Sequence, residues 1–237
     1  MLLAAVETFL RDWPYLTALI VLGVVGVVAG PSLLTASVGV RRLSPSERRA
    51  LASCGVPVDC VRVVARPKGV PTAFAVGVVP GHRYVCVTER LLDLLTPVEL
   101  AGVVAHEVGH LRRYHALPRL GLPTAFVVAW AAAVSADVAG AFLGGLLLVV
   151  PLTLASFATS RWTEFDADDY VARHADGAAL ADALDRLDGA GYLRREESRV
   201  RRLVARHPTL RARVDRLRSA TQTRRGSSEP PRTRSPK

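Results

Sequence analysis

Two long apolar blocks interrupt a sequence that is otherwise rich in charge. No residue from Trp13 to Val40 is charged, and between Arg119 and Arg161 the only charged residue is Asp137. A helix that spans a membrane needs about 20 apolar residues, so the first block predicts one span. As a helix rising about 1.5 Å per residue, the second block would reach about 60 Å, enough to cross a hydrocarbon core about 30 Å thick twice. The pattern therefore predicts about three transmembrane helices, with Asp137 at the far-side turn of a hairpin.

The charges that flank these blocks predict their orientation. Basic residues gather at three block ends: Arg41, Arg42, Arg48 and Arg49 follow the first block, Arg112 and Arg113 precede the second, and Arg161 follows it. The positive-inside rule places these flanks in the cytoplasm. A cleaved signal peptide is the alternative for the first block, but its basic residues would precede the apolar core. A buried helical hairpin of a soluble protein is the alternative for the second block.

The polar segment between the blocks predicts helices combined with a small β-sheet. Ser44-Pro45-Ser46-Glu47 and Thr96-Pro97-Val98-Glu99 each combine an N-cap, a first-turn proline and a capping-box glutamate. We therefore expect helices to begin at both points, the first ending at Gly55 and the second running to about Tyr114. Segments rich in β-branched residues and bounded by proline and glycine predict strands at 59–66, 72–79 and 83–88.

The segment after the second block is polar and predicts mostly helix. Helices are expected at 161–175, from Gly177 to about Leu187, from about Arg194 to Arg206, and from the break at His207-Pro208 to about Arg218. The remaining tail, 219–237, is rich in Arg, Ser, Pro and Thr, and such a composition predicts disorder.

The net charge and its distribution indicate which partners the protein binds. The chain of 237 residues has a net charge of +10, and a basic protein binds nucleic acid or lies beside an anionic leaflet. The basic residues gather at membrane ends, in the last helices and in the tail, and no aromatic residues interleave them as in a single-strand binder. We therefore expect the lipid bilayer as a partner and no specific nucleic acid. Cys54, Cys60 and Cys86 lack metal-ligand spacing, which predicts reduced thiols in a reducing compartment.

A candidate metal site lies on the helix predicted after Thr96. His106-Glu107-Val108-Gly109-His110 matches the pattern HExxH. Residues four apart lie on one face of a helix, so His106 and His110 can bind one zinc ion. Glu107 then faces the water at the metal and can take its proton as the catalytic base.

A catalytic zinc needs a third protein ligand and an open fourth position. His115 is near in sequence, but it follows His106 by nine residues, where the metzincin pattern has ten and a glycine turn. Arg112 and Arg113 stand in place of that turn. We therefore expect His115 to be a polar residue near the membrane surface and not a ligand.

The better third ligand is Glu164, on the helix predicted after the second apolar block. Glu164 and Asp168 are four residues apart and share a helix face. Glu164 can ligate zinc, and Asp168 can accept the ring N–H of a ligand histidine and fix its tautomer. Asp166 and Asp169 are expected to point elsewhere. The alternative for the acidic cluster is a solvated helix face.

The membrane topology tests this ligand set. The histidines precede the second apolar block and Glu164 follows it, so an odd number of crossings would place them on opposite sides of the membrane. Two crossings, which the length of the block predicts independently, return Glu164 to the side of the histidines.

These features resemble the membrane gluzincins that include the HtpX-type heat-shock proteases and the CAAX prenyl endoproteases. The resemblance covers most of residues 43–218 and rests on HEVGH, its Leu-Leu-Asp-Leu-Leu-Thr-Pro-Val-Glu-Leu lead-in, the hydrophobic hairpin, the Arg-x-x-Glu-x-x-x-Asp segment, and His207-Pro208 with Arg213. It implies one zinc ion per chain, an active site on the cytosolic side, and cleavage of membrane or misfolded proteins.

The resemblance also implies roles for residues outside the metal site. An edge strand near Thr72, Ala73 and Phe74 would pair with an extended substrate. His207 and Arg213 would lie near the site and stabilise the oxyanion. A helix cap and a salt-bridge arginine are the alternatives for these two residues. Thr72 replaces an asparagine usual in the family, and Thr209 replaces a proline, so the choice of substrate is more open than the metal chemistry.

We therefore expect an α+β, mostly helical membrane metallopeptidase with a small β-sheet and an HExxH active-site helix. An N-terminal anchor would occupy 1–42, and a zinc peptidase domain 43–218, interrupted by a transmembrane hairpin at about 120–160 and followed by the basic tail. The expected location is the cell membrane, multi-pass, and the substrate a protein or peptide. The alternative function is a non-catalytic zinc-binding membrane regulator or scaffold. A sensor protease would need an outward domain, and an intramembrane protease would place HExxH inside an apolar span.

Overall fold

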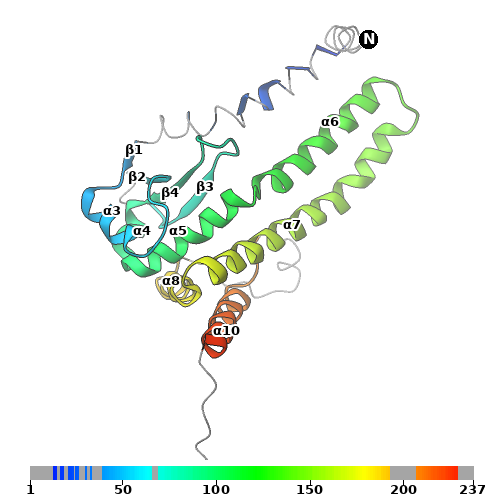
Figure 1. The fold of residues 1–237 in the computed structure, drawn as a ribbon. Coiled ribbons are helices and arrows are strands. Elements are labelled where there is room, and N and C mark those ends of the chain that lie inside the picture. Colours follow the sequence, from blue (N-terminus) through cyan, green and yellow to red (C-terminus); the bar gives the residue numbers. More distant parts are fainter. Residues whose placement is uncertain are drawn as a thin grey trace, which may run out of the picture.

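The computed structural model describes residues 39–65, 69–192 and 207–228, together with isolated residues between Trp13 and Leu33. Most of the predicted first span and the predicted helix from Arg194 to Arg206 lie outside the described residues. The described part forms a body of sheet and helices from which a long helical hairpin projects (Figure 1).

A four-stranded sheet forms one side of the body. Its order is β1 (Val40–Arg42), β2 (Val61–Val64), β4 (Tyr84–Thr88) and β3 (Ala73–Val76). β2 and β4 run parallel, whereas β1 and β3 pair antiparallel with their neighbours. The three predicted strands are confirmed, and β3 lies at the edge of the sheet.

Strand β1 was not predicted. Val40 pairs with Val64 and Arg42 with Arg62, so the sheet begins before the boundary at residue 43 that we expected for the peptidase domain. No pattern in the sequence indicates this strand, because Val40 ends an apolar block, and only its pairing with β2 separates it from that block.

Both capping boxes are present. The Ser44 side chain caps α3 (Pro45–Ala52), and the Thr96 side chain caps α5 (Pro97–Arg112), each with a reciprocal bond from the backbone N–H of the cap to the glutamate three residues on. These bonds satisfy N–H groups that have no partner inside the helix. A short helix that was not predicted, α4 (Glu89–Leu94), leads from the sheet to α5.

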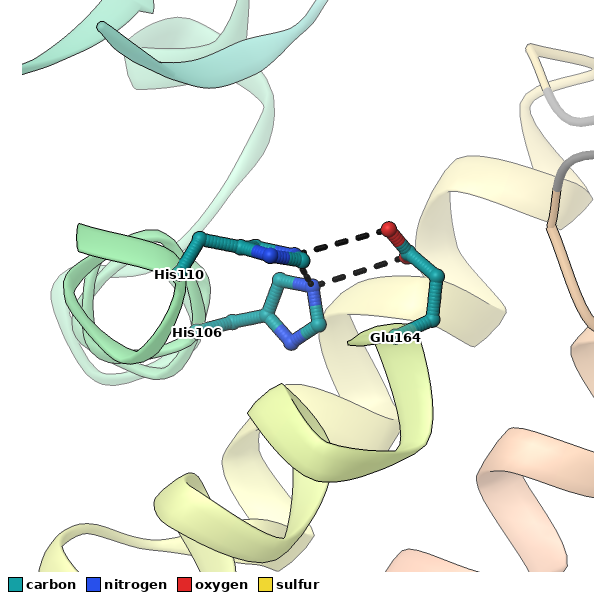
Figure 2. A group of neighbouring side chains, drawn as sticks. All are labelled: His106, His110 and Glu164. Atoms are coloured by element: carbon teal, nitrogen blue, oxygen red, sulfur yellow. Dashed lines mark hydrogen bonds and ion pairs between the residues drawn. The ribbon is translucent and has the colours of Figure 1, made fainter. Parts of the chain in front are cut away.

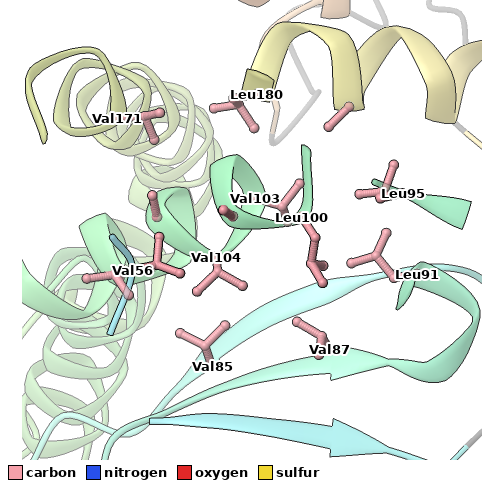
Figure 3. Packing of buried hydrophobic residues seen from close by; sticks show 14 of the residues in the cluster. Val56, Val85, Val87, Leu91, Leu95, Leu100, Val103, Val104, Val171 and Leu180 are labelled. Carbon is pink, nitrogen blue, oxygen red and sulfur yellow. The ribbon is translucent and has the colours of Figure 1, made fainter. Parts of the chain in front are cut away.

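Helix α5 lies at the centre of the core. Val85 and Val87 of the sheet pack against one side of it, and Val171 and Leu180 of the later helices pack against the other (Figure 3). A helix covered on several sides needs small residues where neighbours approach. Gly102 is such a position, since a Cβ there would lie 2.8 Å from the backbone nitrogen of Leu180.

The helical hairpin predicted from the second apolar block is present. A π-helical turn, η1 (Leu117–Gly121), leads into α6 (Leu122–Ser135), and α7 (Ala141–His174) returns alongside it (Figure 1). Asp137 lies in the connecting turn with φ 51°. η1 and α6 taken together (Leu117–Ser135, 19 residues) and α7 (34 residues) are each long and apolar enough to cross a membrane, with mean hydropathy 1.5 and 2.1. Their apolar windows are 0% and 6% buried, which argues against the hairpin of a soluble core.

The helix predicted at 161–175 is not a separate element. It is the last part of α7, which continues from the hairpin to His174 without a break. No glycine or proline follows Pro151 in this helix, so nothing in the sequence ends it earlier. Glu164 is therefore joined rigidly to the returning arm of the hairpin.

The last two described helices cover α5 and α7. α8 (Gly177–Gly189) begins at Asp176, whose carboxylate accepts from the N–H of Ala178, and its predicted position is confirmed. α10 extends from Leu210 to Ser228, ten residues beyond the end that we predicted at Arg218.

The expectation of disorder was therefore wrong for 219–228. The hydroxyls of Ser219, Thr221 and Thr223 donate to the carbonyl four residues back, so the polar side chains that predicted disorder are satisfied on the helix itself. Thr221 also packs against α8, where a Cβ on Gly177 would lie 2.9 Å from its hydroxyl.

Candidate metal centre

Two helices that are distant in sequence bring three metal-binding side chains together. His106 and His110 project from one face of α5, and Glu164 faces them from α7 (Figure 2). The Nε2 atoms of the two histidines are 3.2 Å apart. Glu164 Oε1 lies 3.4 Å from His110 Nε2, and Glu164 Oε2 lies 3.7 Å from His106 Nε2. All three side chains are buried.

These separations fit a tetrahedral zinc site. With bonds of about 2.0–2.1 Å and tetrahedral angles, two ligand atoms lie roughly 3.3 Å apart. Two imidazole nitrogens and one carboxylate oxygen are also the donor types of a catalytic zinc, and they leave a fourth position open. The residues present therefore fit this metal in both chemistry and spacing.

A carboxylate contacts Nδ1 of His106, the ring nitrogen that does not face His110. Asp168 Oδ1 lies 3.0 Å from His106 Nδ1, which leaves Nε2 turned toward the centre of the cluster. Burial opposes a charge on this ring, but Asp168 and Glu164 outweigh burial and raise the pKa of His106 to about 9. The same negative field favours a cation at the centre.

His115 and Asp166 both contact groups of the site, and for Asp166 this corrects an expectation from the sequence. His115 is 2% exposed, and its Nδ1 lies 2.8 Å from His110 Nδ1. Burial and the neighbouring His110 ring lower the pKa of His115 to about 4, so it is neutral at physiological pH. Asp166 does not point away from the site, because its Oδ2 lies 2.9 Å from His115 Nε2. Asp169 does point away, and it pairs with Arg216.

The chain after residue 206 adds an arginine and a histidine near the cluster. Arg213 Nε and Nη2 donate to the two oxygens of Asp168 at 2.8 and 2.7 Å, and its Nη1 lies 3.3 Å from Glu164 Oε2. The Arg213 side chain is 11% exposed, so its guanidinium is buried between two carboxylates. His207 is more open: its side chain is 65% exposed, and its Nδ1 lies 3.3 Å from Glu164 Oε2.

A cavity of about 930 Å³ adjoins the three metal-binding residues. Glu107 lines it, as do Ala73 and Phe74 of the edge strand β3. Three leucines of α8 supply an apolar wall: Leu180, Leu184 and Leu187. Of the site residues singled out from the sequence, all but Asp168 belong to the metal-binding cluster or line the cavity, and Asp168 contacts His106.

Arg119 is a cavity residue that the sequence analysis missed. It extends from the π-helical turn η1, and its Nη2 lies 3.0 Å from Ser160 Oγ and 3.6 Å from Glu164 Oε1. In the sequence it marks only the edge of an apolar block, so no pattern distinguished it from a membrane-flanking arginine.

An HExxH helix whose histidines meet a glutamate of a second helix is the site of a metallopeptidase, and the two candidate membrane spans make this one a membrane metallopeptidase. The sequence model of peptidase family M48 matches residues 41–221, and the chain therefore belongs to this family. A protease HtpX homolog of Acidiphilium cryptum is 32% identical over 219 residues, which are 76% of this chain and 74% of that protein.

Other relatives match over shorter lengths. Protease HtpX homologs of Campylobacter curvus and Pyrococcus abyssi are each 37% identical, over 51% and 57% of this chain. The chain spans about half the length of these two proteins, 47% and 52%. The crystal structure of S. mikatae Ste24p has the same fold, with a TM-score of 0.67, 18% identity, and coverage of 87% of this chain and 58% of that one.

Proposed function

We propose that this chain is a zinc-dependent endopeptidase of the cell membrane that hydrolyses peptide bonds of membrane or misfolded proteins on the cytosolic side. One observation carries the proposal: His106, His110 and Glu164 face one another at tetrahedral spacing beside a cavity that Glu107 lines. One zinc ion per chain satisfies this donor set. Family membership supports the peptidase reaction.

Bound zinc would act as a Lewis acid that polarises the scissile carbonyl and makes water more acidic. Glu107 takes a proton from the attacking water and later passes it to the nitrogen of the leaving amine. His207 lines the cavity and is 65% exposed, and in this proposal it donates a hydrogen bond to the developing oxyanion. Arg213 holds Asp168 and Glu164 in place, because its guanidinium is already paired with both.

The substrate binds as an extended strand. β3 is an edge strand, and its residues Ala73 and Phe74 line the cavity beside the metal-binding residues. A peptide added to this edge would gain main-chain hydrogen bonds, which do not depend on sequence. Its side chains would then face the leucines of α8, so apolar residues are favoured beside the scissile bond.

The membrane arrangement follows from the hairpin and the flanking charges. α6 and α7 cross the bilayer and return, and the part of the first apolar block that precedes β1 supplies a further span. The basic flanks support a cytoplasmic location for the body and its active site. The domain limits that we predicted, 1–42, 43–218 and 219–237, stay as predictions, with β1 and the end of α10 (219–228) added to the peptidase domain.

The Glu107→Gln variant tests the proposed catalytic base. Purified in detergent, it should retain wild-type zinc content but cleave an unfolded membrane protein about 10²–10⁴-fold more slowly, the usual loss of general-base catalysis. Glu164→Ala is the matched comparison, since it should lose zinc as well as activity.

Two results would count against this assignment. Cleavage by Glu107→Gln at the wild-type rate would show that another group is the base. Stoichiometric zinc in the wild-type protein without cleavage of any unfolded substrate would favour the zinc-binding regulator or scaffold instead.

A further inference from the structure

A series of hydrogen-bonded side chains begins at Nδ1 of His110, the ring nitrogen that does not face Glu164. His110 Nδ1 lies 2.8 Å from His115 Nδ1, and His115 Nε2 lies 2.9 Å from Asp166 Oδ2. Arg113 forms an ion pair with the same carboxylate and also donates to the Asp166 backbone carbonyl. His110 and His115 are 8% and 2% exposed, so bulk water has little access to the contact between the two rings.

The proton positions along this series follow from the metal site. If His110 binds zinc through Nε2, its Nδ1 must carry the proton and donate. His115 Nδ1 must then accept, so the proton of His115 stays on Nε2 and points to Asp166. An ionised carboxylate only accepts hydrogen bonds, so Asp166 fixes which nitrogen donates and which accepts in each hydrogen bond of the series.

From this series of hydrogen bonds we infer that His115 and Asp166 are positioning residues that fix the tautomer and ring orientation of His110. The inference rests on the proposed zinc site. The two ligand histidines are thus held differently. Asp168 contacts His106 directly, whereas Asp166 reaches His110 only through the imidazole of His115. Outer partners of this kind orient metal ligands and raise their basicity.

The backbone after α5 is bent to make this contact. Tyr114 has φ 54°, a left-handed conformation that costs free energy in a residue other than glycine, asparagine or aspartate. The turn brings the N–H of His115 to the carbonyl of His110 at 3.1 Å and returns the His115 ring to the His110 ring. The centroids of the two rings are 4.9 Å apart, so the strained turn and the ring contact belong to one arrangement.

The test compares two aspartate-to-asparagine variants three residues apart on α7. Asp166→Asn replaces a group that only accepts by an amide that also donates, so the proton on His115 no longer has a fixed position. Asp169→Asn makes the same chemical change in an exposed ion pair with Arg216 and is the control. Zinc affinity is measured by competition with a chromophoric chelator, and the d–d spectrum is recorded with Co²⁺ in place of zinc.

We expect Asp166→Asn and His115→Ala each to weaken zinc binding about 10–100-fold and to alter the Co²⁺ spectrum. Because the two groups act in series, the double variant should bind zinc no more weakly than His115→Ala alone. Asp169→Asn should match the wild type in both measurements. Circular dichroism of the metal-free proteins tests folding. If His115→Ala fails to fold, the Asp166→Asn variant alone decides the test, because Asp166 is partly exposed and its replacement should leave the fold intact.

The inference is overturned if folded Asp166→Asn binds zinc as tightly as Asp169→Asn, or if the losses in the double variant add. In that case the wild type still binds zinc, so the proposed function stands. A wild-type protein that binds no zinc would instead overturn the proposed function and this inference together.

Discussion

Replacing Asp168 by asparagine should damage both the stability of the fold and the metal site, whereas the same change at Asp169 should damage neither. The Asp168 side chain is 1% exposed and has three charge-assisted contacts: 3.0 Å to His106 Nδ1, and 2.8 and 2.7 Å to two nitrogens of Arg213. Asparagine keeps one accepting oxygen and turns the other into a donor. At least one buried N–H of His106 or Arg213 therefore loses its acceptor.

The magnitude follows from these contacts. A buried donor left without a partner costs about 1–3 kcal/mol, and breaking a buried ion pair costs about 3–5 kcal/mol. Glu164 Oε2 remains 3.3 Å from Arg213 and compensates part of the lost charge. We therefore expect Asp168→Asn to lower the free energy of unfolding by about 2–4 kcal/mol. Zinc binding should weaken about 10–100-fold, because the tautomer of His106 is no longer fixed.

Asp169→Asn is the matched control on the adjacent residue. Its ion pair with Arg216 has side-chain exposures of 34% and 50%, and such pairs contribute about 0.2–1 kcal/mol. Unfolding of both variants is followed in detergent on metal-free protein, so that weaker zinc binding does not count as lost stability. Zinc affinity is then measured separately by chelator competition. The reasoning is refuted if the two variants unfold within about 0.5 kcal/mol of each other and bind zinc equally.

Two further predictions concern the packing of α5 and the metal. Gly102→Ala should lower stability by about 1–3 kcal/mol, because its Cβ would lie 2.8 Å from Leu180 N, a backbone atom that cannot rotate away. Gly189→Ala, whose Cβ would have no described atom within 4 Å, should be neutral or stabilising by up to about 1 kcal/mol. Equal melting temperatures of the two variants would contradict the close approach at Gly102. Chelation should abolish cleavage and lower the melting temperature, since a ligand at 100 times its Kd stabilises by about 2.7 kcal/mol. Zinc but not calcium should restore both, and cleavage that survives complete removal of the metal would exclude the proposed mechanism.

Much of the local structure was predictable because it depends on short spacings. The capping boxes at Ser44 and Thr96 each use residues three apart, and the strands show in runs of β-branched residues. The two candidate ligands on α5 are four residues apart, which puts them on one helix face wherever that helix lies. The approach of Glu164 was predictable for a different reason: the length of the apolar block requires an even number of crossings.

The rest depended on contacts between distant segments. His115 and Asp166 are 51 residues apart, and Arg213 and Asp168 are 45 apart, so no spacing reports that either pair meets. Strand β1 exists as a strand because β2 lies beside it, and the helix at 219–228 is helical where its composition predicted disorder.

The sequence by itself thus determined which side chains can bind the metal, because helix periodicity and the parity of membrane crossings are properties of one chain segment at a time. The tertiary structure decided which polar groups form hydrogen bonds to those side chains. The packing of α7 against α5 and of α10 against α7 places Asp166, Asp168 and Arg213 at hydrogen-bonding distance. A change of a few ångströms in that packing would break every one of these contacts while leaving each helix intact.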